Sequence, residues 1–85
     1  MNAISWTPKA AKQLRKLPGA DQVTIRDAVG EQLAIFPDGT GVKRLTDHAY
    51  PYRLRVGRYR VFFAFDGAIR LISIEEVKKR DDRTY

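Results

Sequence analysis

Apolar residues recur at helical spacing in the first part of the chain, which predicts two helices. Thr7 followed by Pro8 is typical of a helix start, because threonine caps the helix and proline suits its first position. Apolar residues then recur three to four positions apart until Pro18 ends the helix. A second apolar stripe predicts another helix over about residues 21–36. Two helices joined so closely indicate a helical hairpin.

The rest of the chain alternates between apolar and polar residues, a pattern typical of strands. Short strands are predicted at 2–6 and 42–46, and longer ones at 52–56, 59–65 and 68–74. The predicted order is therefore β-α-α-β-β-β-β. Helices that come together and are followed by a run of strands indicate an α+β fold. We expect the helical hairpin to pack on one face of a small, mainly antiparallel sheet.

The last predicted hairpin has a strong turn signal. Asp66 followed by Gly67 is typical of a two-residue type I′ turn. Such a turn would place Val61 opposite Ile72. Residues 75–85 show little periodicity, so we expect them to form a polar tail.

The alternation gives the predicted sheet two different faces. One face is apolar, and we expect the helices to cover it. The other carries arginines at one end and four apolar residues at the other. These four form either a second core patch or a docking surface for a partner. The inner set is Tyr52, Leu54, Val56, Tyr59, Val61, Phe63, Ile72 and Ile74, and the outer set is Phe62, Ala64, Ile69 and Leu71.

Arginines dominate the segment 52–60. If Gly57 and Arg58 form a two-residue type II′ turn, Arg55 lies directly opposite Arg60 on the neighbouring strand. Like charges in such positions destabilise a sheet, so we expect the pair to hold an anion. Guanidinium groups bind phosphate oxygens in a fork and stay charged at any working pH. The hairpin alone favours binding of nucleic acid over catalysis.

Composition narrows the class of protein. The 85 residues suffice for one domain, 1–85, and their net charge of +6 predicts a partner that is a nucleic acid, an acidic protein or an anionic membrane. The lack of cysteine excludes disulfides and thiolate metal sites, and His48 is the only histidine. No apolar run is long enough to span a membrane, and the first residues lack the features of a signal peptide. We expect a cytoplasmic protein.

Three segments together resemble the RelE/ParE superfamily, the toxins of type II toxin-antitoxin systems. They are residues 4–10, the arginine-rich block 52–63, and the basic closing segment 77–85 with its tyrosine. The resemblance covers almost the whole chain. RelE-like members are endoribonucleases that cleave messenger RNA in the ribosomal A site, and an antitoxin encoded beside them neutralises them. ParE-like members instead poison DNA gyrase and lack the catalytic residues.

The resemblance implies a role for each residue of a catalytic set. Arg55 and Arg60 would bind the scissile phosphate, Arg53 would orient the RNA backbone, and Arg80 would assist the leaving group. Tyr85 would stack on a base. Further basic residues would bind RNA, and Lys79 is an alternative for the role of Arg80. The RNA-binding set is Arg58, Lys43, Arg44, Lys78, Lys79 and Arg83.

One departure from the RelE pattern affects proton transfer. Arg53 and Arg55 match positions that are lysines in the best-known RelE pattern, and arginine cannot readily accept a proton. The proton acceptor is therefore open between Tyr85, Lys79 and His48.

The leading hypothesis is a toxin that cleaves messenger RNA by attack of a 2′-hydroxyl on the adjacent phosphate. The expected products are a 2′,3′-cyclic phosphate and a 5′-hydroxyl, and no metal or other cofactor is expected. Its partners would be the ribosome, messenger RNA and a cognate antitoxin. The alternatives are a ParE-like gyrase poison without nuclease activity, or an inactive module that binds nucleic acid or protein.

Overall fold

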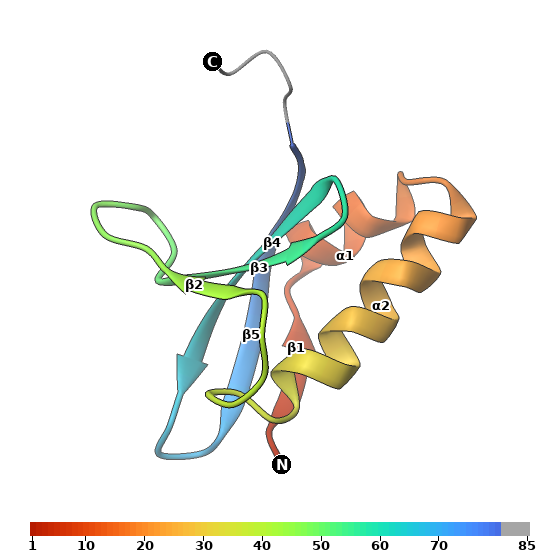
Figure 1. Cartoon of the computed structure of the whole chain (residues 1–85). Coiled ribbons are helices and arrows are strands. Elements are labelled where there is room, and N and C mark those ends of the chain that lie inside the picture. Colours follow the sequence, from red (N-terminus) through yellow and green to blue (C-terminus); the bar gives the residue numbers. More distant parts are fainter. Residues whose placement is uncertain (81–85) are drawn as a thin grey trace.

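The computed structural model describes residues 1–80, in which two helices cover one face of a five-stranded sheet (Figure 1). The strand order is β1-β5-β4-β3-β2, with β1 parallel to β5 and the other neighbours antiparallel. The predicted α+β fold and the order of its elements are confirmed. The elements are β1 (Ala3–Trp6), α1 (Pro8–Arg15), α2 (Gly19–Leu33), β2 (Val42–Arg44), β3 (Tyr52–Val56), β4 (Tyr59–Asp66) and β5 (Leu71–Lys79).

Helix α1 begins where the sequence predicts. The hydroxyl of Thr7 accepts a hydrogen bond from the backbone N–H of Ala10 at 3.1 Å, and Pro8 occupies the first turn. Helix α2 ends at Leu33, three residues before the predicted end. The buried side-chain amide of Asn2 donates to the carbonyls of Leu33 and Phe36, at 3.0 and 2.7 Å. It thereby satisfies backbone acceptors at the end of α2 and ties the chain start to it.

The core lies between the helices and the inner face of the sheet. Seven of the eight residues predicted for that face are buried, and Tyr52 is half-buried against the same core. The helices contribute Ala10, Leu14, Ile25, Val29 and Leu33 to it. No helix in residues 1–80 is long and apolar enough to cross a membrane.

The connection between β4 and β5 differs from the prediction. Asp66 pairs with Leu71, so four residues separate the strands instead of two. Val61 lies opposite Val77 and not opposite Ile72. Arg70 adopts a positive φ of 54°, a conformation that the sequence does not signal because it is uncommon outside glycine, asparagine and aspartate. The predicted polar tail is also wrong, because β5 continues to Lys79.

A β-bulge at Glu75 shifts the alternation within β5. Phe63 pairs with Ile74 and Phe62 with Glu76, so Glu75 is the extra residue. Beyond the bulge every side chain faces the side opposite to the one that strict alternation would give. Val77 therefore enters the core, and its backbone N–H donates to the side chain of Gln13 on α1 at 2.7 Å.

The four outer apolar residues do not share one environment. Phe62 is buried, because the connection between β2 and β3 folds over it. Ala64 and Leu71 are half-buried, while Ile69 lies in the turn before β5 with 66% of its surface exposed. The prediction of a second core patch therefore holds for Phe62, and the prediction of an open surface holds for Ile69.

Candidate nucleic-acid interface

The hairpin of β3 and β4 places two arginines face to face. Val56 pairs with Tyr59 and Arg55 with Arg60, as the sequence predicts. Gly57 has a φ of +55°, which the first central residue of a type II′ turn requires. The turn therefore fixes the register that brings the two guanidinium groups onto the same face of the sheet.

Cations extend this pair across four strands on the outer face. Arg60 on β4 has Arg55 on one side and Lys78 of β5 on the other. In the next row, Arg53 of β3 lies opposite Lys43 of β2. Because side chains of paired residues lie on one face, these five form a continuous basic surface. We call it the basic face.

Arg80 joins the basic face from the end of β5. Its backbone N–H donates to the carbonyl of Arg58 at 2.6 Å, which holds the chain beside the hairpin turn. Burial lowers the pKa of Arg53, and the charges of Arg60, Arg55 and Arg80 lower it further. The other three arginines are thus close enough to act on the guanidinium group of Arg53.

None of the cations of the basic face forms an ion pair within the described part of the chain, although the carboxylate of Glu76 lies near Lys78. The one ion pair in residues 1–80 joins Lys9 to Glu76, at 2.7 Å. The Nε of Arg53 is buried, and no acceptor in residues 1–80 lies within hydrogen-bonding distance of it. Unbalanced positive charge of this kind favours binding of an anion, and a fork of guanidinium groups suits phosphate oxygens.

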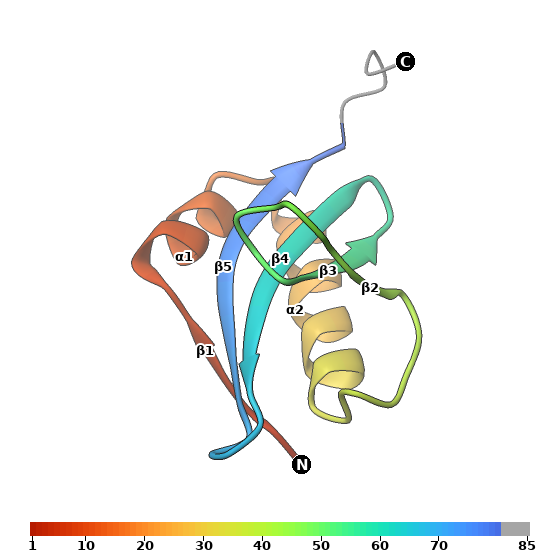
Figure 2. The same cartoon turned by 90° about the vertical axis from the view of Figure 1, so that its left-hand side faces the viewer.

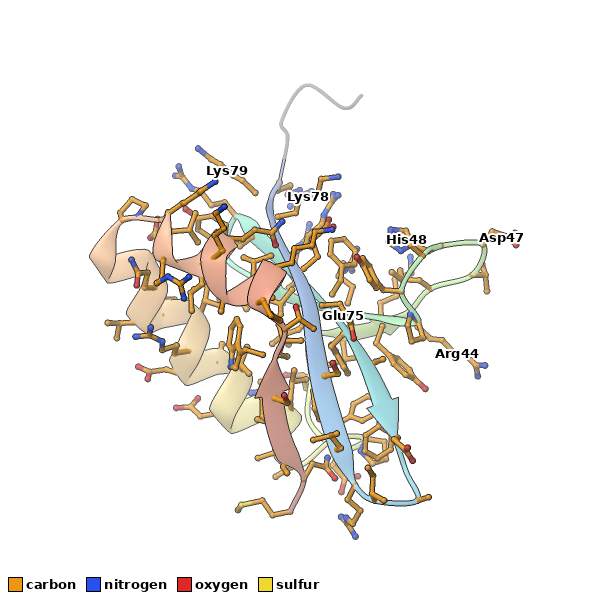
Figure 3. The ribbon with its side chains drawn as sticks, turned by 180° about the vertical axis from the view of Figure 1, so that it is seen from behind. Arg44, Asp47, His48, Glu75, Lys78 and Lys79 are labelled. Atoms are coloured by element: carbon orange, nitrogen blue, oxygen red, sulfur yellow. The ribbon has the colours of Figure 1, made fainter. Side chains whose placement is uncertain are left out.

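Two residues of the predicted RNA-binding set lie on the other side of the sheet. Arg44 pairs with Tyr52, and Lys79 pairs with Tyr59, so both follow the face that carries the core. Figure 3 shows Lys79 on the side of α1 and Lys78 on the opposite side. Lys79 therefore faces away from the arginines of the basic face. The exposed Arg58 lies in the turn itself.

Tyr85 and Arg83 lie outside the described residues. The stacking role of Tyr85 and the RNA contact of Arg83 therefore remain predictions from the sequence.

The structure adds a cluster that the sequence does not reveal. The connection between β2 and β3 crosses the outer face, opposite the helices (Figures 1 and 2). The His48 ring stacks on the Phe62 ring, with centroids 5.0 Å apart and planes 12° apart. The Tyr50 ring also contacts Phe62, at 5.9 Å. A connection without periodicity carries no signal for this packing; the only sequence clue is a phenylalanine on the arginine face.

The hydrogen bonds of this cluster define what its groups can do. The backbone N–H of Tyr50 donates to Nδ1 of His48 at 3.1 Å, so the neutral ring carries its proton on Nε2. In this arrangement His48 offers a donor and not a proton acceptor. The hydrogen bond from Lys9 to Glu76 lowers the pKa of the Glu76 carboxyl, which makes that carboxylate a weaker base. In residues 1–80 no three His, Asp or Glu side chains come together to bind a metal.

Residues 4–83 match the family described as the ParE toxin of type II toxin-antitoxin systems, parDE. No curated protein sequence matches the chain significantly.

Several solved structures share the fold. The RelBE2 toxin-antitoxin complex from Mycobacterium tuberculosis matches with a TM-score of 0.82 and 24% identity, over 93% of this chain and 98% of that one. The isolated Escherichia coli RelE toxin matches with a TM-score of 0.80 and 15% identity, over 99% and 89%. An archaeal RelE-RelB complex from Pyrococcus horikoshii gives 0.70 and 23%, over 95% and 97%. At these identities the likeness establishes the fold alone.

Proposed function

This chain belongs to the family of ParE toxins of type II toxin-antitoxin systems, and we propose that it acts by cleaving messenger RNA on the ribosome. The observation that carries the proposal is the basic face. Arg55 and Arg60 lie directly opposite each other, and together with Arg80 they lower the pKa of the neighbouring Arg53. A sheet keeps such a pair at a cost in stability. A phosphate between the arginines would offset that cost.

In the proposed reaction the 2′-oxygen of one nucleotide attacks its own 3′-phosphate. A bond forms between the 2′-oxygen and phosphorus, and the bond from phosphorus to the 5′-oxygen breaks. Negative charge grows on the phosphate oxygens, where Arg55 and Arg60 would stabilise it. Fixed donors aimed at developing charge contribute about 3 kcal/mol each in well-studied enzymes. Arg53 would orient the backbone, Arg80 would donate a hydrogen bond to the leaving 5′-oxygen, and that oxygen would take a proton from water to become the 5′-hydroxyl.

Proton transfer is the part of the reaction that the arginines do not perform. They stay protonated at any working pH, so another group must take the proton of the 2′-hydroxyl. Of the three predicted acceptors, Lys79 lies on the helix side and His48 presents a donor. The remaining predicted acceptor is Tyr85, which would take the proton in its phenolate form.

The protein partner in this proposal is an antitoxin. The RelE toxins of Mycobacterium tuberculosis and Pyrococcus horikoshii were solved in complexes with RelB antitoxins. An acidic segment of a cognate antitoxin would neutralise the basic face and block access of RNA to it. The proposed site of action is the cytoplasm, where ribosomes and messenger RNA are found.

A second candidate function is inhibition of DNA gyrase without nuclease activity. The family description favours it, since it names the ParE toxin. In that case the basic face only binds its target. No proton transfer is needed, so the shortage of proton acceptors beside the basic face in residues 1–80 does not matter.

A translation extract distinguishes the two. The purified protein is added to the extract, and the ends of a reporter message are mapped by primer extension. Message cleavage at A-site codons, lost when ribosomes are removed, is the expected result. An intact message, together with inhibition of supercoiling by purified gyrase, would overturn the nuclease proposal in favour of the second candidate.

A further inference from the structure

The His48 ring forms an exposed aromatic surface beside the basic face. It lies almost parallel to the ring of Phe62, which is only 5% exposed. His48 itself is exposed, so the side of the ring turned away from Phe62 faces outward. A buried phenylalanine under an open imidazole is a flat platform with a firm support.

Contacts within the connection and contacts from α1 and β5 hold this platform in place. Nδ1 of His48 accepts from the backbone N–H of Tyr50, which sets the ring orientation. The ammonium group of Lys9 on α1 donates to the Tyr50 hydroxyl at 3.4 Å and to Glu76 of β5 at 2.7 Å. The backbone N–H of Leu45 donates to the carbonyl of Pro51 at 2.8 Å, which closes the base of the connection.

The platform and the arginines are close enough for a single nucleotide to contact both. Phe62 pairs directly with Arg53 across the hairpin, and Arg60 lies two residues away on the same face of β4. Two residues along a strand span roughly 6.8 Å. A nucleotide whose phosphate is bound by Arg55 and Arg60, and whose backbone is oriented by Arg53, would therefore place its base over the ring of His48.

From this arrangement we infer that His48, supported by Phe62, is a stacking site for the base of the nucleotide whose phosphate the basic face binds. The inference rests on the proposed function and adds a base contact to it. Its ligand class is a nucleobase of single-stranded RNA. Aromatic side chains beside basic grooves bind such bases through their π-faces, with little dependence on base identity.

Binding of an uncleavable RNA tests the inference apart from catalysis. The probe is a fluorescein-labelled hexanucleotide with 2′-O-methyl sugars, followed by anisotropy at low salt without ribosomes. A matched series replaces one base at a time with an abasic residue. For the wild type, and equally for Tyr85→Ala, which lacks the other predicted stacking residue, we expect the abasic position over His48 to lower affinity roughly tenfold or more. His48→Ala should bind the intact probe as weakly as the wild type binds that abasic probe. His48→Phe should again bind the intact probe more tightly than the abasic one.

Two results would overturn the inference: equal binding of the intact and all abasic probes by the wild type, or an unchanged abasic penalty in His48→Ala. The comparison of probes on the wild type needs no variant, so a folding defect cannot hide the answer. Message cleavage is scored separately in the translation extract. If the protein shows the abasic penalty but leaves messages intact, the stacking site is supported and the nuclease proposal is wrong.

Discussion

The two faces of the β3–β4 hairpin use the same strands for opposite purposes. On the inner face Leu54, Val61 and Phe63 are at most 1% exposed, and their burial stabilises the fold. On the outer face, the alternate residues nearest the hairpin turn are arginines, of which Arg55 and Arg60 lie opposite each other. Apolar packing thus supports a surface that is unfavourable by itself. Substitutions on the two faces should separate stability from activity.

The largest effect on stability is expected on the inner face. Phe63 is fully buried and packs against Phe36 and Tyr52. Phe63→Ala should lower the free energy of unfolding by about 3 to 5 kcal/mol, measured by urea denaturation. Leu71→Ala, on the half-buried outer face, is the matched control and should cost less than half as much. Equal losses for the two variants would mean that the faces do not differ in this way.

On the outer face, a substitution is expected to raise the free energy of unfolding instead of lowering it. Arg53 has a buried Nε without an acceptor in residues 1–80 and three neighbouring guanidinium groups. Arg53→Met keeps its packing and removes the charge, so the free energy of unfolding should rise by about 1 kcal/mol while message cleavage falls. Lys43→Met, opposite it on exposed β2, should change stability less. A clear loss of stability in Arg53→Met would argue against charge repulsion at this site.

The smallest effect concerns the ion pair beside the platform. The pKa of Glu76 lies below its ordinary value of 4.5 because of its hydrogen bond with Lys9. A carboxylate with a lowered pKa stabilises the fold above the ordinary pKa, and this contribution disappears as the pH falls through the folded-state value. Glu76→Gln should therefore flatten the fall of the urea midpoint below about pH 4.5.

The control for this titration is Glu31→Gln, since the exposed Glu31 forms no ion pair within residues 1–80. It should keep the acid dependence of the wild type. The same dependence in Glu76→Gln would count against a stabilising role of the pair.

Local patterns explain which parts of the fold the sequence predicts. The alternation around Gly57 is strict, so the register of Arg55 with Arg60 follows from it. The β4–β5 connection could not be predicted in the same way. Arg70 adopts a positive φ, and the turn is longer than the two residues that Asp66 and Gly67 suggest. The backbone N–H of Ala3 on β1 donates to the carbonyl of Arg70 at 3.0 Å, a contact between residues far apart in the sequence that local turn signals do not reveal.

The site was less predictable than the fold for two physical reasons. The bulge at Glu75 reverses the alternation of β5, so Lys78 and not Lys79 lies beside Arg60. Such a bulge is fixed by cross-strand packing and not by local propensity. The stacking of His48 on Phe62 depends on a connection held by contacts to α1 and β5, which are distant in the sequence.

The most direct test of the central claim compares Arg60→Ala with Arg26→Ala. Arg60 lies on the basic face, whereas the exposed Arg26 lies on α2, on the other side of the sheet (Figure 1). The single-turnover rate of ribosome-dependent message cleavage should fall about 100-fold to 1,000-fold in Arg60→Ala, with no loss of stability in urea, and stay unchanged in Arg26→Ala. Wild-type cleavage by a folded Arg60→Ala protein would contradict the claim that the outer arginines carry the chemistry.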